Sequence, residues 1–302
     1  MKLIIQIPCL NEENMLPVTL SDIPKFISGI DAIETLVIDD GSTDRTLEVA
    51  KNNGVSHIIS FKTHRGLAQA FRAGIEECVR LGADIIVNTD ADHQYCGDDI
   101  RELITPILDS KADFVIGVRP ILEIRDYPKT KKILQYLGSF IVRIISNTRI
   151  IDATSGFRAI SRNAAMRINI FSNYTYTLET IIQAGIKRLS IVSVPIKINP
   201  ETRDSRLLKN IPSYVFYSTI TIIRIFLLYR PLFLFIPLSI LFILIGILAL
   251  GYNSYISTVL LCTGIIIILI GIISDMNSAN RGLLEEIRYV QKQTDTYHHR
   301  YE

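Results

Sequence analysis

The sequence predicts an α/β domain with a mostly parallel sheet covered by helices on both faces, followed by a hairpin of two transmembrane helices. Over residues 1–200, short apolar runs alternate with helix-length amphipathic segments, a pattern typical of a parallel sheet. Residues 231–274 contain no charged side chain. The mean hydropathy of the 302 residues is +0.30, which is too high for an ordinary water-soluble enzyme.

Five apolar runs are the predicted strands of the sheet. They are LIIQIP (3–8), TLVIDD (35–40), HIISF (57–61), DIIVNTD (84–90) and DFVIGV (113–118). Helical patterns at 42–53, 66–81 and 97–110 separate them. Ligands of such sheets bind at the carboxyl ends of the strands. Four runs end in polar residues there, namely PCLNE (8–12), DDGS (39–42), DADHQ (90–94) and GVR (117–119).

Asp90, Asp92 and Gln94 are the candidate metal ligands. Side chains two positions apart lie on the same side of an extended backbone, so the three would share one side if the chain stays extended. Their hard oxygen atoms suit Mg²⁺ or Mn²⁺ that bridges a substrate diphosphate. The alternative is that the carboxylates only stabilise a turn or cap a helix. The sequence contains neither G-x-G-x-x-G nor G-x-x-x-x-G-K-[ST], so a diphosphate would be held by metal and cations.

Two apolar runs, 231–250 and 255–273, are the predicted membrane spans. A helix of 19–20 residues covers about 30 Å, the thickness of the hydrocarbon core of a bilayer. Buried helices of a large soluble core are the alternative. Residues 211–230 have the pattern of an amphipathic helix in the headgroup layer, or of a core helix of the soluble domain.

Charges predict the orientation of the chain. Lys and Arg precede and follow the apolar hairpin, whereas its connector, residues 251–254, has none. The positive-inside rule therefore places domain 1–210, both termini and the tail 275–302 in the cytosol. A short charged helix is expected at 281–293. The formal net charge of +2 makes nucleic acid a poor candidate for a partner.

Taken together, these residues resemble the family 2 glycosyltransferases of the Rossmann-like GT-A fold, and among them the polyprenyl-phosphate glycosyltransferases, which include dolichol-phosphate mannose synthases. The resemblance covers most of residues 3–210. The motifs that carry it are PCLNEE (8–13), VIDDGSTDRT (37–46), RGLAQAFRAG (65–74), NTDADHQY (88–95), DATSGFRA (152–159) and ETRDSRLLK (201–209).

The resemblance implies a role for each matching position. Asp90, Asp92 and Gln94 would hold Mg²⁺ or Mn²⁺ on the donor, and Asp92, Arg119 and Asp152 would be the catalytic residues. The positions implied in nucleotide-sugar binding are Pro8, Leu10, Asn11, Glu12, Val37, Asp39, Asp40, Asp90, Ala91, Asp92, Arg119, Arg203 and Arg206.

Several of these positions have a second interpretation. Arg203 and Arg206 would contact phosphates, anchor the chain to anionic lipid, or do both. Their spacing is shorter than the R-x-x-G-E-S-K of the mannose synthases, and Tyr95 follows Gln94 where the family commonly has His or Asn. Asp152 would orient the acceptor loop or a metal-bound water, or would be a structural turn residue. Glu179, in a predicted helix at 176–185, is expected to be structural.

The predicted activity is transfer of one sugar from a UDP- or GDP-sugar to undecaprenyl or dolichyl phosphate at the cytosolic face, with inversion. The alternatives are a transferase that acts on a lipid-linked oligosaccharide or glycolipid, and an inactive membrane scaffold. The absence of Trp excludes the Q-x-x-R-W motif of processive synthases. Gly246, Gly264 and Gly271 would permit close helix contact in a homo-oligomer.

Overall fold

The computed structural model describes residues 1–121, 129–171, 175–200 and 211–301. The chain divides into two compact units. The first comprises Met1–Thr221 together with Gln291–Glu302, and the second is Ile222–Val290. Each unit is considered separately below.

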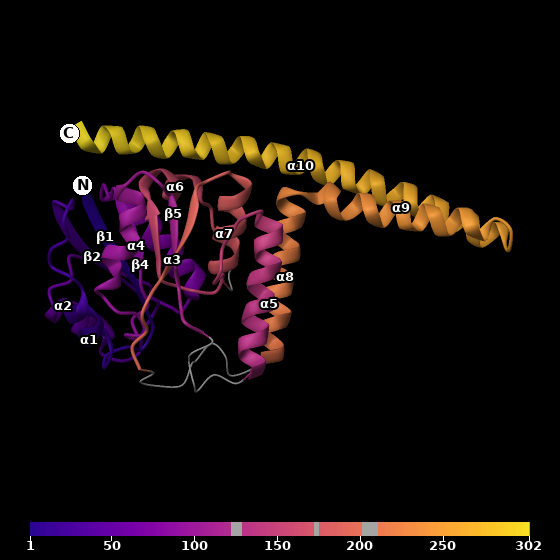
Figure 1. The fold of residues 1–302 in the computed structure, drawn as a ribbon. Helices are drawn as coiled ribbons and strands as arrows, with labels where there is room; N and C mark the ends of the chain where they lie inside the picture. The colour runs from indigo at the N-terminus through magenta and orange to yellow at the C-terminus, as the bar shows by residue number, and fades with distance from the viewer. Residues whose placement is uncertain (122–128, 172–174, 201–210, 302) are drawn as a thin grey trace. The chain divides into compact units, whose positions relative to one another are not determined.

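A single seven-stranded sheet organises the first unit, with the strand order β3-β2-β1-β4-β6-β5-β7 among the described residues (Figure 1). The strands are β1 (Lys2–Cys9), β2 (Ala32–Asp39), β3 (His57–Ser60), β4 (Ile85–Asn88), β5 (Phe114–Val118), β6 (Arg158–Ser161) and β7 (Ile191–Pro195). The pairs β1–β2, β1–β4, β2–β3 and β5–β7 are parallel, and β6 runs antiparallel to both β4 and β5. The predicted α/β class and mostly parallel sheet are therefore confirmed.

Helices cover both faces of this sheet. The helices described up to residue 186 are α1 (Leu16–Asp22), α2 (Thr46–Asn52), α3 (Leu67–Arg80), α4 (Asp99–Leu108), α5 (Lys129–Ser146), α6 (Arg162–Arg167) and α7 (Thr177–Ile186), and α5 packs against α7. Alternate side chains of β1 point to opposite faces, as the strand period requires. Ile5 belongs to the apolar core that contains Leu103 of α4, whereas Gln6 lies against Gly74 of α3.

The reversed strand β6 matters most for the site. Because β6 is antiparallel, it begins at the edge where β4 ends, and Arg158 pairs with Asn88 across the two strands. The segment that leads into β6 therefore lies beside the residues that follow β4. Sequence periodicity did not predict β6 or β7, since both are short and β6 is surrounded by helical segments.

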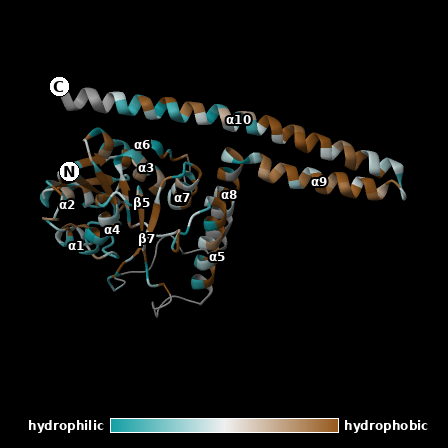
Figure 2. Cartoon of the chain, turned by 45° about the horizontal axis from the view of Figure 1, so that its top comes forward, coloured by the Kyte–Doolittle hydropathy of each residue, from teal (hydrophilic) through white to brown (hydrophobic). Residues whose placement is uncertain are grey.

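The second unit consists of long, mostly apolar helices. Helices α8 (Ile211–Tyr229), α9 (Pro231–Ala249) and α10 (Ser254–Tyr301) end the chain. Among the described residues, α9 and α10 are long and apolar enough to cross a membrane. Figure 2 shows α9 and the first half of α10 as hydrophobic and the rest of α10 as more polar. Residues 281–293 are helical, as expected, but they do not form a short helix of their own. They are part of α10, because no proline interrupts it and the charged residues continue it.

Glycines let α9 and α10 approach closely. A Cβ added at Gly264 would lie 2.6 Å from Ile243, and one at Gly271 would lie 2.7 Å from Phe235. At Gly246, the added atom would lie 3.0 Å from Leu261. The Ser239 hydroxyl also donates a 2.7 Å hydrogen bond to the Gly264 carbonyl. The close contact that these glycines permit is thus formed between helices of one chain.

Candidate active site

Hydrogen bonds join the segment that follows β1 to the segment that follows β2. The backbone N–H of Asn11 donates to the Ser42 hydroxyl (2.9 Å), and the Asn11 side chain accepts from the N–H of Thr43 (2.8 Å). Asn11 has a φ of 55°, in the left-handed region that Asn tolerates better than most residues. The N–H of Glu12 donates to the Thr46 hydroxyl (2.8 Å). These bonds bring two of the predicted nucleotide-binding segments together.

The two carboxylates at the end of β2, Asp39 in the strand and Asp40 directly after it, are buried and accept hydrogen bonds. Asp39 accepts from the Ser42 N–H (3.0 Å) and from the Ser60 hydroxyl (2.9 Å). Asp40 accepts from the backbone N–H groups of Arg65 and Gly66, at 2.7 and 2.9 Å. Asp40 therefore joins the end of β2 to the start of α3.

The predicted nucleotide-binding residues differ in their exposure. Pro8 is a buried strand residue, and Leu10 is half-buried at the strand exit. Val37 is completely buried in the apolar core, and Ala91 is 4% exposed. The structure therefore does not bring the Val37 side chain to the accessible edge of the sheet.

Asp90 and Asp92 lie in a turn after β4. The expected extended backbone is wrong, because His93 has a φ of 57° and the Gln94 N–H bonds back to the Asp92 carboxylate at 3.2 Å. The two carboxylates are nevertheless electrostatically coupled. Burial and the charge of Asp92 together raise the pKa of Asp90 to about 7, although the Arg119 and Arg158 cations act in the opposite direction.

The oxygen atoms of Asp90, Asp92 and Gln94 fit a divalent cation whose other ligands come from a substrate. Within the described residues, no group of three or more His, Cys, Asp or Glu side chains surrounds a metal position. Two neighbouring carboxylates that repel each other, with Gln94 in the same turn, leave positions for diphosphate oxygens and water. A bound Mg²⁺ or Mn²⁺ would relieve the repulsion that raises the pKa of Asp90.

Arg119 and Asp152 form a buried ion pair. The Arg119 Nε and Nη2 atoms donate to the two Asp152 oxygens at 2.8 and 3.0 Å, and Nη2 also donates to the Thr154 hydroxyl at 2.7 Å. Burial by itself raises the pKa of Asp152, but the Arg119 charge and the hydrogen bonds outweigh burial, and the pKa is lowered overall. Asp152 is thus an ionised carboxylate that orients a guanidinium.

Arg158 is a structural cation that sequence reasoning did not single out. It is completely buried, and its guanidinium donates to the carbonyls of Ala153, Ser155 and Thr177, at 2.9, 2.7 and 2.9 Å, and to the Thr180 hydroxyl at 2.7 Å. Burial lowers its pKa to about 10, so it remains protonated at neutral pH. Arg158 therefore ties the 153–155 loop to the start of α7. The only signal in the sequence was its place in the DATSGFRA motif.

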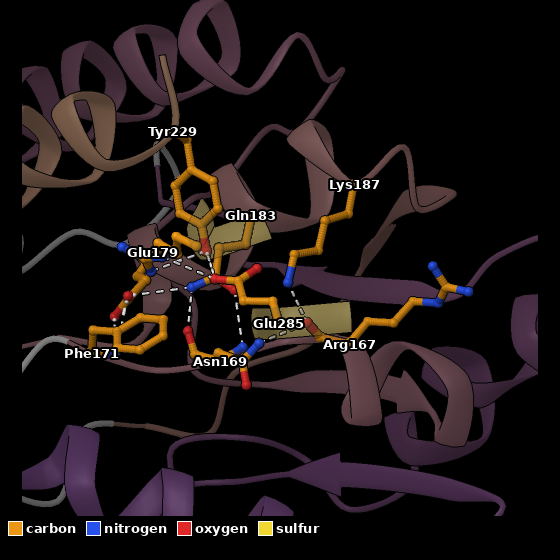
Figure 3. A network of polar contacts seen from close by, with 9 residues as sticks. Arg167, Asn169, Phe171, Glu179, Gln183, Lys187, Tyr229 and Glu285 are labelled. Atoms are coloured by element: carbon orange, nitrogen blue, oxygen red, sulfur yellow. Dashed lines mark hydrogen bonds and ion pairs between the residues drawn. The ribbon is translucent and has the colours of Figure 1, made fainter. Parts of the chain in front are cut away.

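Glu179 anchors a second loop. Its carboxylate accepts from the Phe171 N–H at 3.1 and 3.2 Å and from the Gln183 amide at 3.3 Å, and Gln183 accepts from the Asn169 N–H at 2.9 Å (Figure 3). Glu179 is 1% exposed. These contacts agree with the structural role predicted for it. Arg203 and Arg206, in contrast, lie outside the described residues.

Comparison with known proteins identifies the class to which this fold and site belong. The family described as glycosyl transferase family 2 matches residues 4–168, so the chain belongs to that family and is a glycosyltransferase. Its structure resembles glucosyl-3-phosphoglycerate synthase from Mycobacterium tuberculosis in complex with Mn²⁺ and uridine diphosphate. The TM-score is 0.57 at 18% identity, over 73% of this chain and 79% of the other. This likeness confirms the GT-A fold.

Curated relatives show which members of the family this chain is similar to. A UDP-N-acetylglucosamine–dolichyl-phosphate N-acetylglucosaminyltransferase of Methanococcus voltae is 31% identical over 212 residues, which are 63% of this chain and 83% of the relative. An undecaprenyl-phosphate mannosyltransferase of Micrococcus luteus is 27% identical over 206 residues, 65% of this chain and 83% of the relative. The chain is therefore similar to polyprenyl-phosphate glycosyltransferases, as the motifs predicted.

Proposed function

We propose that this protein transfers a single sugar from a nucleotide-sugar to a polyprenyl phosphate at the cytosolic face of a membrane, with inversion at the anomeric carbon. The observation that carries the proposal is the combination, in one chain, of a family 2 catalytic domain with two helices long and apolar enough to span a bilayer. The relatives named for dolichyl and undecaprenyl phosphate support this acceptor class.

The donor would bind along the carboxyl edge of β1, β2 and β4. Asp39 lies at the end of β2, next to the hydrogen-bonded segments that follow β1 and β2, and it would accept hydrogen bonds from the base. Asp90 and Asp92, with Gln94, would hold Mg²⁺ or Mn²⁺ against the diphosphate. When bound, the metal ion would neutralise charge on the leaving nucleoside diphosphate.

Arg119 would supply the second positive charge. Its guanidinium is held in one orientation by Asp152 and Thr154, so it would meet a phosphate without first paying the entropy of ordering its side chain. Fixed guanidinium donors suit phosphate oxygens, both of the leaving diphosphate and of an acceptor phosphate. Asp152 would then be a positioning residue for Arg119.

The proposed reaction needs no proton acceptor on the protein. An oxygen of the acceptor phosphate would form a bond to the anomeric carbon, and the bond from that carbon to the diphosphate oxygen would break. A phosphate is already anionic near neutral pH, whereas an alcohol would need a base to remove its proton. The burial and pairing of Asp152 support a phosphate acceptor, because this carboxylate is poorly suited to act as a base.

The membrane would hold the catalytic unit close to its lipid substrate. Residues 231–250 and 255–273 would span the bilayer, and 211–230 would lie among the headgroups. The domain 1–210 and the tail 275–302 would be cytosolic. Helix α5 supports a nearby lipid surface, because Ile133, Tyr136 and Ile144 are 64%, 69% and 63% exposed on a helix that also carries Lys132 and Arg143.

A transfer assay tests the proposal. The purified full-length chain is incubated with Mg²⁺ or Mn²⁺, undecaprenyl or dolichyl phosphate, and a panel of radiolabelled UDP- and GDP-sugars. We expect an organic-extractable, acid-labile sugar that is lost in Asp92→Asn. The matched control is Asp98→Asn, since Asp98 is an exposed carboxylate in the same loop.

Two outcomes would contradict the proposal. If a nucleotide-sugar binds with metal but no donor yields a labelled lipid, the acceptor is wrong, and lipid-linked oligosaccharides and glycolipids become the next acceptors to test. If no nucleotide-sugar binds at all, an inactive scaffold replaces the enzyme. Inversion is tested by treating the labelled lipid with hydrolases specific for the α or the β anomer. The enzyme that releases the labelled sugar shows whether the anomeric configuration of the product is opposite to that of the donor.

A further inference from the structure

Tyr95 lies directly after the proposed metal-binding turn and is held rigidly. Tyr95 is 4% exposed. Its ring stacks on the ring of Phe157, with the ring centroids 4.9 Å apart and the ring planes inclined by 8°. Its backbone forms an isolated antiparallel bridge with Ile198. The position of its hydroxyl is therefore set by packing on the ring and by pairing of the backbone.

The Tyr95 hydroxyl joins two parts of the site. It accepts a hydrogen bond from the Gly156 N–H at 3.1 Å. The Asp90 carboxylate lies near enough that its charge adds to burial in raising the pKa of Tyr95. A hydroxyl has one proton to donate, and here the backbone N–H occupies an acceptor position. The phenolic proton is thus available to the Asp90 carboxylate.

Gly156 confirms how closely these groups pack. A Cβ added at Gly156 would lie 3.0 Å from each of the two Asp90 carboxylate oxygens. The carboxylate therefore lies against the backbone of Gly156, and the Tyr95 hydroxyl accepts a hydrogen bond from the N–H of the same residue. The same loop carries Asp152 and Thr154, which hold Arg119.

We propose that Tyr95 is a positioning residue that fixes the Asp90 carboxylate, relative to the 152–156 loop, in the orientation needed to bind the divalent metal ion. This inference rests on the proposed function, which makes Asp90 a metal ligand. Asp92 repels Asp90, and a hydrogen bond donated by the Tyr95 hydroxyl, which Gly156 holds beside the carboxylate, would oppose the rotation that this repulsion favours. Groups that orient metal ligands typically change metal affinity about 10- to 100-fold when they are removed.

Tyr176 provides a matched control. It is also a buried tyrosine with a stacked ring, 3.8 Å from the centroid of Phe71. Its hydroxyl is 3.1 Å from the Asn88 amide nitrogen, which donates to it. The Tyr176 hydroxyl also lies beside Gly156, 3.1 Å from the position of the added Cβ. Replacement of Tyr176 by Phe therefore removes a second buried hydroxyl beside Gly156 and leaves the hydrogen bond between Tyr95 and Gly156 in place.

The test measures metal binding separately from catalysis. The full-length protein in detergent is titrated with Mn²⁺, alone and with UDP or GDP, and free Mn²⁺ is followed by electron paramagnetic resonance. We expect Tyr95→Phe to weaken Mn²⁺ binding about 10- to 100-fold, and Tyr176→Phe to change it less than about threefold. Tyr95→Phe keeps the ring that packs on Phe157, so circular dichroism and thermal unfolding should show a folded protein.

Asp92→Asn separates failure of this inference from failure of the proposed function. If Asp92→Asn loses Mn²⁺ binding but Tyr95→Phe binds like the unaltered protein, the positioning role is wrong and the metal site stands. Equal losses in Tyr95→Phe and Tyr176→Phe also overturn the inference, because they indicate a general effect of removing a hydroxyl. If Asp92→Asn binds Mn²⁺ normally, the proposed metal site is wrong, and the role of Tyr95 is overturned with it.

Discussion

Replacement of Asp152 by Asn tests whether the buried ion pair with Arg119 holds the site together. The side chains of Arg119 and Asp152 are only 8% and 1% exposed, and two hydrogen bonds join them. Removing one partner of such a pair leaves a buried charge without compensation, at a cost of about 3–5 kcal/mol. We expect Asp152→Asn to lower the free energy of unfolding by about 3 kcal/mol, at the lower limit, because the Asn carbonyl still accepts one hydrogen bond.

A double-mutant cycle isolates the pair from its surroundings. Arg119→Met removes the charge that Asp152→Asn leaves unpaired, so the double variant should be more stable than the sum of the two single effects predicts. Urea unfolding of the full-length protein in mild detergent, followed by circular dichroism, measures all four proteins at pH 7. A coupling free energy below about 0.5 kcal/mol would refute the reasoning, because independent sites show additivity within that range.

The pH dependence of the cycle gives a further check with a defined sign. The pKa of Asp152 is lowered in the folded protein, so its ionisation stabilises the fold above the unfolded pKa. That contribution should disappear as the pH falls through the lowered folded pKa. A coupling that instead grows as the pH falls would contradict the assignment of an ionised Asp152.

Three further predictions concern other contacts. Gly156→Ala should displace the Asp90 carboxylate and weaken Mn²⁺ binding, whereas Gly138→Ala, with no atom within 4 Å, should not; equal affinities would contradict this. Mn²⁺ binding should weaken as the pH falls below about 7, because protons then compete for Asp90, and a flat profile between pH 5 and about 7 would refute it. Gly264→Val should destabilise the hairpin by about 1–3 kcal/mol in thermal unfolding, with Gly282→Ala as the control; unchanged melting would show that the helices separate easily.

Local patterns were enough to predict five of the seven strands described in the catalytic unit. All five expected strands are present, because each is an apolar run between turn or helix signals, and burial of such a run depends on its own residues. The acidic residues after β2 and β4 also lie at the same edge, since the carboxyl ends of parallel strands must meet there. The same periodicity did not predict the turn at His93, where the backbone leaves the extended conformation.

The predicted membrane hairpin likewise follows from composition. Two apolar runs of span length predict two helices, and α9 and α10 contain them. The sequence also placed glycines in these helices. Which surface the glycines contact depends on the rotation of each helix, and only the structure shows that Gly264 faces Ile243 of the same chain.

The sequence by itself determined the α/β class, the apolar hairpin and the family, because these depend on residue order and on patterns within short segments. Only the tertiary structure decided how residues distant in sequence combine. Arg119 meets Asp152, and Tyr95 meets Gly156, because the antiparallel strand β6 starts at the edge where β4 ends. Such contacts depend on strand order and direction, which short-range periodicity does not encode. The buried position of Arg158 has the same origin, since its partners come from a loop and a helix that the fold brings together.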